Sequence, residues 1–173
     1  MNPTAPAMLP AIEVSVPDSD WSVASIKSIE MGCGVAFTAS LRYQGKKVAV
    51  IENDGRGGVP IVIWTVRNVD TPRTAWATWV NGYQQLNGPA EDMPEPEYCA
   101  ILSLMDNHEI AAALRKDSRK GIPVLAVGAH LREGGAYAVA TRRTVSNPAD
   151  IEALRLGRSE YDRYWDGERW IAL

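Results

Sequence analysis

A glycine-rich run between two apolar segments contains the residue types that could most directly do chemistry. Its backbone N–H groups could form a nest for an anion, with the guanidinium of Arg56 as a clamp. The same run fits a β-turn with a bulge, in which the Asn and Asp side chains bond locally. A Walker loop or a dinucleotide fingerprint lacks support, because an apolar strand and not a helix is expected to follow. The candidate anion-binding residues are Asn53, Asp54, Gly55, Arg56, Gly57 and Gly58.

The two cysteines and two histidines could in principle supply four zinc ligands. They form no C-x-x-C or H-x-x-x-H pair, so the spacing of a zinc knuckle is missing. His108, which lies between Asp106 and Glu109, could act as a general base only if a carboxylate held it in space, and a helix surface explains these residues equally well. Glu52 and Asp54 lack a convergent third ligand. The sequence therefore predicts no metal site, no cofactor and no catalytic residue, and it favours a binding protein over an enzyme.

Two further groups of side chains could bind a partner. An aromatic stripe at helical spacing could stack bases or anchor a protein, although packing of the helix against the sheet is the interpretation that we favour. A basic group could hold phosphates or an acidic partner, and cations at a helix C-terminus explain it as well. The stripe consists of Trp76, Trp79 and Tyr83, and the basic group consists of Arg115, Lys116, Arg119 and Lys120, joined by Arg142 and Arg143.

Composition limits the classes of partner. The 18 Lys and Arg against 21 Asp and Glu give a net charge of -3, which argues against a general coating of nucleic acid, although a local basic patch could still bind it. Six Trp and six Tyr against one Phe favour half-exposed aromatic positions, where their polar atoms find partners. No apolar run approaches the roughly 20 residues that span a bilayer. The absence of Lys and Arg before Lys27, together with the low number of cysteines, predicts a cytoplasmic protein without a signal peptide.

The order of the expected elements predicts an α+β fold, with an N-terminal antiparallel β-meander packed by helices and with C-terminal strands and a hairpin. Alternating apolar residues at 35–43, followed by the turn at Gln44-Gly45, indicate a hairpin within this meander. A helix is expected from an N-cap at Thr71, with Pro72 at its first position. The remaining expected elements are a helix at 98–120, strands at 122–127 and 136–141, a helix at 147–157, and a final hairpin that contains Trp165 and Trp170.

The proline-rich residues 1–20 are expected to form a loose N-terminal arm, in which Ile12, Val14 and Val16 could make a short edge strand. Residues 21–173 are expected to form a single α+β domain. Prolines and acids at 86–97 suggest a solvated linker that could separate two lobes of this domain.

The segment LRYQGKKV at 41–48, which runs toward the glycine-rich loop, resembles a group of uncharacterised bacterial and phage proteins. Those proteins share a strand, a Gly-Lys-Lys turn, a second strand and an Asn-Asp-Gly-x-Gly-Gly run, followed by helices and a basic, strand-forming C-terminal part. The likeness is most specific at this hairpin and looser over 98–145. The resemblance implies an α+β fold and implies no activity.

Three functions are open on this sequence. The first is a small cytoplasmic interaction protein that binds a macromolecular partner, a protein above all, and an anti-CRISPR-like, phage-encoded inhibitor of bacterial defence would be one instance. The second is a nucleotide or nucleic-acid ligand-binding protein, or an enzyme, that uses the Asn53–Gly58 turn and Arg56. The third is a nucleic-acid binder that uses the basic group. The sequence leaves open the identity of the partner, the oligomeric state and the role of the final hairpin.

Overall fold

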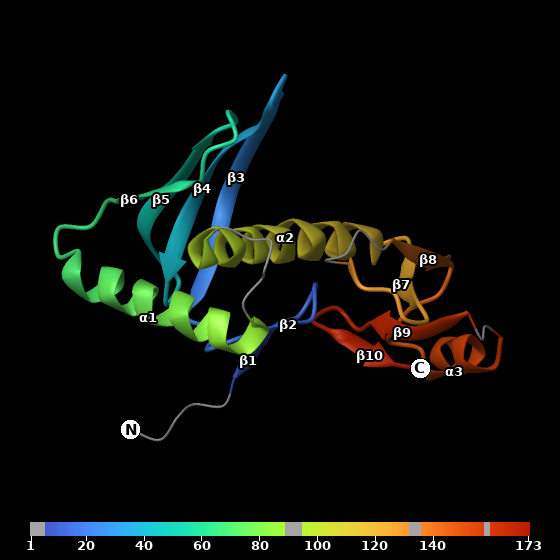
Figure 1. Cartoon of the computed structure of the whole chain (residues 1–173). Coiled ribbons are helices and arrows are strands. Elements are labelled where there is room, and N and C mark those ends of the chain that lie inside the picture. Colours follow the sequence, from blue (N-terminus) through green and yellow to red (C-terminus); the bar gives the residue numbers. More distant parts are fainter. Residues whose placement is uncertain (1–5, 89–94, 132–135, 158–159) are drawn as a thin grey trace. The chain divides into compact units, whose positions relative to one another are not determined.

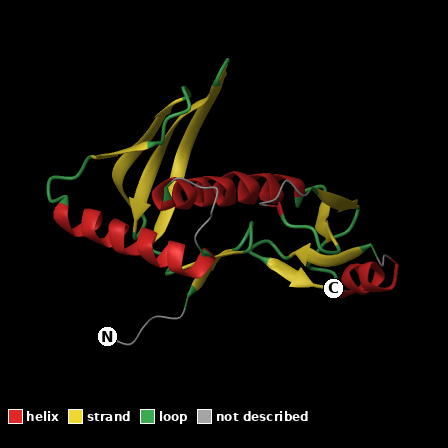
Figure 2. Ribbon diagram, in the orientation of Figure 1, coloured by secondary structure: helices red, strands yellow, loops and turns green. Residues whose placement is uncertain are grey.

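The computed structural model describes residues 6–88, 95–131, 136–157 and 160–173. The predicted α+β fold is confirmed, because the described residues form three helices and ten strands in antiparallel sheets (Figures 1 and 2). The chain divides into two compact units: unit 1 contains Met1–Leu9 and Val14–His108, and unit 2 contains Pro10–Glu13 and Glu109–Leu173. No helix among the described residues is long and apolar enough to cross a membrane.

Unit 1 is built on a meander sheet with the strand order β3-β4-β5-β6. Its strands are β3 (Trp21–Met31), β4 (Gly34–Tyr43), β5 (Lys46–Asp54) and β6 (Ile61–Trp64). The alternation predicted for β4 is confirmed, since Phe37, Ala39 and Leu41 are buried and the residues between them are more exposed. The turn between β4 and β5 is also as predicted: Gln44 and Gly45 both have positive φ, which a two-residue hairpin of right-handed twist requires.

Helix α1 (Asp70–Asn87) follows the meander, and α2 (Pro96–Asp117) comes next along the chain. The expected N-cap at Thr71 is wrong, because the helix begins at Asp70, two residues before Pro72, and Val69 precedes it without a side-chain cap. Pro72 still lies in the first turn, where its missing N–H removes no intrahelical bond. The linker expected at 86–97 lies partly outside the described residues, and the division between the units falls inside α2, after His108.

The N-terminal segment is more ordered than the loose arm expected from its prolines. Strands β1 (Ala7–Leu9) and β2 (Val14–Val16) pair into a two-stranded antiparallel sheet. Apolar side chains from this segment are buried, among them Leu9, Ile12 and Val16. The prolines lie outside the two strands, so they remove no hydrogen bond between them. The apolar residues between the prolines can therefore still form paired strands.

Of the described residues, unit 2 contains the end of α2 from Glu109 onward, a sheet of order β10-β9-β7-β8 and one short helix. Its elements are β7 (Gly121–Ala126), β8 (Tyr137–Thr141), α3 (Pro148–Gly157), β9 (Tyr161–Trp165) and β10 (Trp170–Ala172). The final hairpin joins the sheet through β9, which pairs with β7.

Residues 10–13 complete this second unit from the other end of the chain. The indole N–H of Trp170 donates to the carbonyl of Ala11 at 3.0 Å, and both residues belong to one buried cluster. Arg163 forms an ion pair with Glu13 and donates to the carbonyl of Ala129. The Arg163 side chain is only 16% exposed, and a charge that is largely removed from water requires such partners.

Candidate functional site

The glycine-rich loop between β5 and β6 is organised by its own side chains. Asn53 Oδ1 accepts the N–H of Gly55 at 2.8 Å, and Asn53 Nδ2 donates to the carbonyl of Gly58 at 2.9 Å. Asp54 Oδ1 accepts the N–H of Arg56 at 3.0 Å. Two of the N–H groups that an anion nest would use are therefore bonded inside the loop, as in a local Asx turn.

The glycine at the start of this loop is required by close packing against the β3–β4 turn. A Cβ on Gly55 would lie 2.7 Å from the backbone nitrogen of Ala36, and Gly55 has φ of +73°. The thiol of Cys33 donates to the carbonyl of Gly55 at 3.1 Å. This arrangement explains the composition of the loop without a ligand.

Two substitutions in this loop are expected to have opposite outcomes. Gly55→Ala should lower the free energy of unfolding by about 2 kcal/mol or more, because it combines a strained φ with a backbone clash. Arg56→Ala should change it by less than about 0.5 kcal/mol, since the side chain is exposed and the loop bonds use only backbone at this residue. Urea unfolding of both variants measures the difference. A bound nucleotide that Arg56→Ala releases would instead support the anion site.

The aromatic stripe of α1 lies in the interior of unit 1 and is not a free partner surface. Trp76, Trp79 and Tyr83 are each at most 3% exposed. The ring of Trp76 stacks on that of Trp79 and packs against Trp21 of β3. Its indole N–H donates to Glu97 Oε1 at 2.6 Å, and the Tyr83 hydroxyl bonds Ser103 Oγ at 2.8 Å. Packing therefore accounts for nearly all of the surface of these three side chains, and they form no exposed aromatic stripe on α1.

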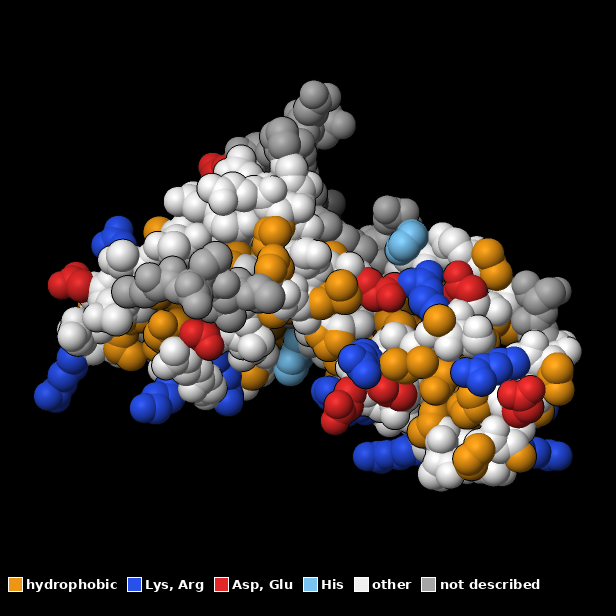
Figure 3. Space-filling view, turned by 90° about the horizontal axis from the view of Figure 1, so that it is seen from below, with side chains coloured by type: hydrophobic (Ala, Val, Ile, Leu, Met, Phe, Trp, Pro, Cys, Tyr) orange, Lys and Arg blue, Asp and Glu red, His pale blue; other side chains and the backbone are white. Residues whose placement is uncertain are grey.

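The basic group is gathered at one end of unit 2. The backbone N–H of Arg142 donates to the carbonyl of Lys120 at 3.3 Å, so the structure brings the two parts of the group together. Arg143 is half-buried and lies 4.0 Å from Asp150, and the other five basic residues are exposed. Acidic side chains stand among the basic ones on the face of unit 2 that Figure 3 shows. This mixture weakens the field that a phosphate backbone needs.

One of these acids is held by two neighbours at the end of α2. Asp117 accepts from Lys120 Nζ at 2.6 Å and from the Tyr137 hydroxyl at 2.8 Å. Both hydrogen bonds lower the pKa of the Asp117 carboxyl, and the bond from Lys120 has the larger effect. Burial, and to a smaller extent the hydrogen bond to Asp117, raises the pKa of Tyr137 to about 12. The hydrogen bond between Asp117 and Tyr137 links α2 to β8. The bond between Lys120 and Asp117 offsets the positive charge that Lys120 would offer to a phosphate.

No group of three or more His, Cys, Asp or Glu side chains in the described parts of the chain is arranged to hold a metal ion. Of the two cysteines, Cys33 is exposed and Cys99 is buried.

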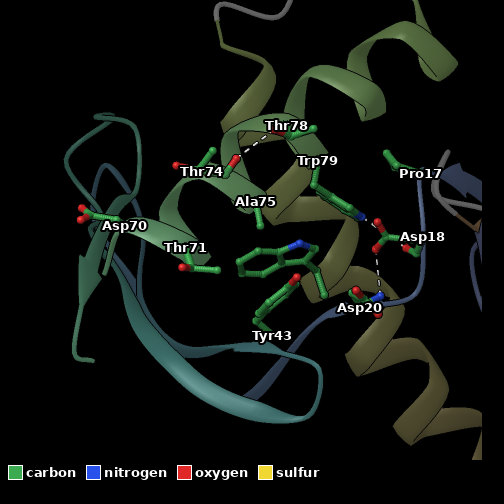
Figure 4. A pocket seen from close by; sticks show the side chains of 11 residues that line it. Pro17, Asp18, Asp20, Tyr43, Asp70, Thr71, Thr74, Ala75, Thr78 and Trp79 are labelled. Atoms are coloured by element: carbon green, nitrogen blue, oxygen red, sulfur yellow. Dashed lines mark hydrogen bonds between the residues drawn. The ribbon is translucent and has the colours of Figure 1, made fainter. Parts of the chain in front are cut away.

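A cavity of about 610 Å³ in unit 1 gathers residues that the sequence analysis did not connect (Figure 4). We call it the acidic pocket. Asp18 and Asp20 lie together on one side of it, and Asp70 lies on the opposite side (Figure 4). Its lining contains no Lys, Arg or His. Aromatic rings of Trp21, Tyr43 and Trp79 also line it, together with threonines on one face of α1.

The two neighbouring acids of the acidic pocket are held in place by the backbone and by α1. Asp18 Oδ1 accepts the N–H of Asp20 at 2.9 Å, and the Asp18 carbonyl accepts the indole N–H of Trp79 at 3.3 Å. Asp20 Oδ2 accepts Gln44 Nε2 at 3.0 Å. The carboxylates are therefore positioned before any ligand arrives.

The aromatic walls of the pocket differ in how much surface they offer. Trp21 and Trp79 are 3% and 2% exposed, so they form the base. Tyr43 is half-buried, and its ring centroid lies 4.7 Å from that of Trp21. Carboxylates beside aromatic rings suit an organic cation, because the charge faces the acids and the carbon stem lies against the rings.

The sequence contained a partial signal for this site. Asp18 and Asp20 stand directly before a strand that begins with Trp21, and threonines recur on one face of α1. Both acids fall within residues 1–20, for which the prolines predict a loose N-terminal arm. Tyr43 and α1 meet them only through the fold.

No protein-family model matches the chain, and neither a curated protein nor a solved structure matches it significantly.

Proposed function

We propose that this chain is an interaction protein that binds a macromolecular partner, and that the acidic pocket receives a Lys or Arg side chain of that partner. The observation that carries the proposal is the pocket of about 610 Å³ in which the neighbouring carboxylates of Asp18 and Asp20 lie beside three aromatic rings, with no basic residue in the lining (Figure 4). A guanidinium or ammonium group can form ion pairs with the carboxylates and also pack against the aromatic rings. Three separate acids with no metal-holding geometry favour an organic cation over a metal ion.

The partner fits a protein better than a free amine. Tyr43 and the half-buried acids form an open rim at which a side chain can enter while its backbone stays outside. Aromatic anchors and paired charges of this kind dominate the energetics of many protein interfaces. An inhibitor of a bacterial defence system, encoded by a phage, is one instance of such a protein. We propose the cytoplasm as its compartment, because a chain with two cysteines does not have the disulfide framework typical of small secreted domains.

Arginine amide is the probe that tests the pocket, with citrulline amide as a neutral ligand of the same shape. Arginine amide should shift the indole N–H resonances of Trp21 and Trp79 in NMR spectra, with a Kd on the order of 1–10 mM for a single side chain. Citrulline amide should not. The double variant Asp18→Asn/Asp20→Asn should weaken binding about five- to thirtyfold, because each of the two exposed ion pairs contributes about 0.5–1 kcal/mol.

The variant is designed to keep the fold, since each Asn retains an oxygen that can accept the bonds made by Asp18 and Asp20. Glu52→Gln is the matched control: it removes one charge from an exposed position of unit 1 outside the pocket lining. Equal binding of arginine amide and citrulline amide would contradict the proposal.

Capture from a bacterial lysate then tests the macromolecular partner. A protein that is retained by the wild type and by Glu52→Gln but lost with Asp18→Asn/Asp20→Asn would support the proposal. Nucleic acid that is retained at low salt and released at high salt would instead support binding through the basic group, which the Arg142–Lys120 backbone bond assembles.

A further inference from the structure

The two edges of the meander sheet in unit 1 differ in how they are protected. Strand β3 has a register shift between Ala24 and Lys27, and it carries Lys27 and Glu30. Bulges and charges of this kind prevent an edge strand from pairing with another chain. Strand β6 at the opposite edge has the sequence Ile-Val-Ile-Trp and carries no charge. Ile61 is 65% exposed and Ile63 is 44% exposed.

The register of β6 determines which of its backbone groups face outward. The N–H of Thr65 donates to the carbonyl of Val48 at 2.9 Å, and Ile63 lies opposite Val50. In an antiparallel pair, bonded positions alternate, so the backbone groups of Ile61, Ile63 and Thr65 point toward β5. Those of Val62 and Trp64 therefore point to the open edge, and no described residue outside the sheet bonds them.

We propose that β6 pairs with β6 of a second copy of this chain, in antiparallel register centred on Ile63. Val62 of each copy then lies opposite Trp64 of the other, and these residues are the ones with outward N–H and C=O groups. The pairing is self-complementary, as a two-fold interface requires. A neutral strand meets itself without repulsion, and the exposed isoleucines of the two copies form one apolar cluster.

The surface beside the strand favours the same occupant. A cavity of about 480 Å³ lies along β6; Val62 and Trp64 from the strand and Trp76 and Val80 from α1 line it, together with the charged Arg73 and Glu97. In the paired arrangement, Trp64 of each copy lies beside Val62 of the other and so stands at the mouth of this cavity. A four-residue strand pair is a small interface, so the expected Kd is on the order of 10–100 µM.

Sedimentation equilibrium over about 5 µM to 1 mM protein tests the association. The average mass of the full chain should rise with concentration toward twice the monomer mass. Ile63→Lys, which places two ammonium groups across the symmetry axis, should weaken the association at least tenfold. Ile29→Lys is the matched control, because Ile29 is 64% exposed on the protected edge strand β3, and it should leave the association unchanged.

Cross-linking tests the register independently. Position 63 would face its own copy in a non-bonded pair with Cα atoms about 4.5 Å apart, which a disulfide can bridge. Ile63→Cys in a Cys33→Ser background should therefore form a disulfide dimer with diamide as oxidant, whereas Ile61→Cys should not, because position 61 would face position 65. A chain that is monomeric at every concentration, or equal cross-linking at the two positions, overturns the proposal. A monomer that binds extended apolar peptides along β6 would assign the edge to a segment of another protein.

Discussion

Alanine at position 121 is expected to lower the free energy of unfolding of unit 2 by about 3 kcal/mol or more. Gly121 is the buried first residue of β7 and pairs with Thr141 of β8. A Cβ there would lie 2.2 Å from the carbonyl oxygen of Ala140 and 2.8 Å from the Cα of Thr141. Both neighbours are backbone atoms, so relief requires the two strands to separate.

Urea unfolding followed by circular dichroism measures this effect. Gly157→Ala is the control in the same unit, because a Cβ at the end of α3 meets nothing within 4 Å. That control should be neutral or stabilising by a few tenths of a kcal/mol, since alanine restricts the unfolded chain. If Gly121→Ala unfolds at the same urea concentration as Gly157→Ala, the close approach of β7 and β8 is wrong.

Replacing Trp76 by alanine is the second substitution with a large expected effect, a loss of about 3–5 kcal/mol in the stability of unit 1. Trp76 is 3% exposed, and its ring centroid lies 5.4 Å from that of Trp79 and 4.8 Å from that of Trp21. Its N–H also holds the Glu97 carboxylate. One side chain therefore links α1 to β3 and to the start of α2.

Trp76→Phe separates packing from hydrogen bonding. It keeps most of the ring contacts and removes the donor to Glu97, for an expected loss of about 1–2 kcal/mol. Leu86→Ala on the same helix is the control, because Leu86 is 40% exposed and its truncation should change stability by less than about 1 kcal/mol. A Trp76→Ala variant as stable as Leu86→Ala would show that the aromatic stripe is not part of the core.

The local elements of unit 1 could be predicted from the sequence, because their signals lie within a few residues. The alternation of Phe37, Ala39 and Leu41 indicated a half-buried strand, and Gln44-Gly45 indicated its turn. The helix start was displaced by two residues, since Thr71 resembles a cap while the first backbone bond is accepted by Val69. Such shifts change no packing face.

The candidate site could not be predicted in the same way, because it is assembled from segments far apart in the chain. Asp18 and Trp79 are 61 residues apart, and their hydrogen bond exists only after folding. The most conspicuous local motif, the loop at Asn53–Gly58, is explained by its own side chains and by the approach of Ala36 to Gly55. A glycine-rich run signals close backbone approach as readily as it signals a ligand.

The contribution of Pro10–Glu13 to unit 2 has a consequence for synthesis on the ribosome. The hydrogen bond between Ala11 and Trp170 joins residues 159 positions apart, and the ion pair between Glu13 and Arg163 joins residues 150 positions apart. The N-terminal segment is made first and cannot take its place in unit 2 until Arg163 and Trp170 have been synthesised. During that interval the apolar residues of the segment are available to chaperones or to the wrong strand. Unit 2 therefore cannot complete its folding before all the residues of unit 1 have been synthesised.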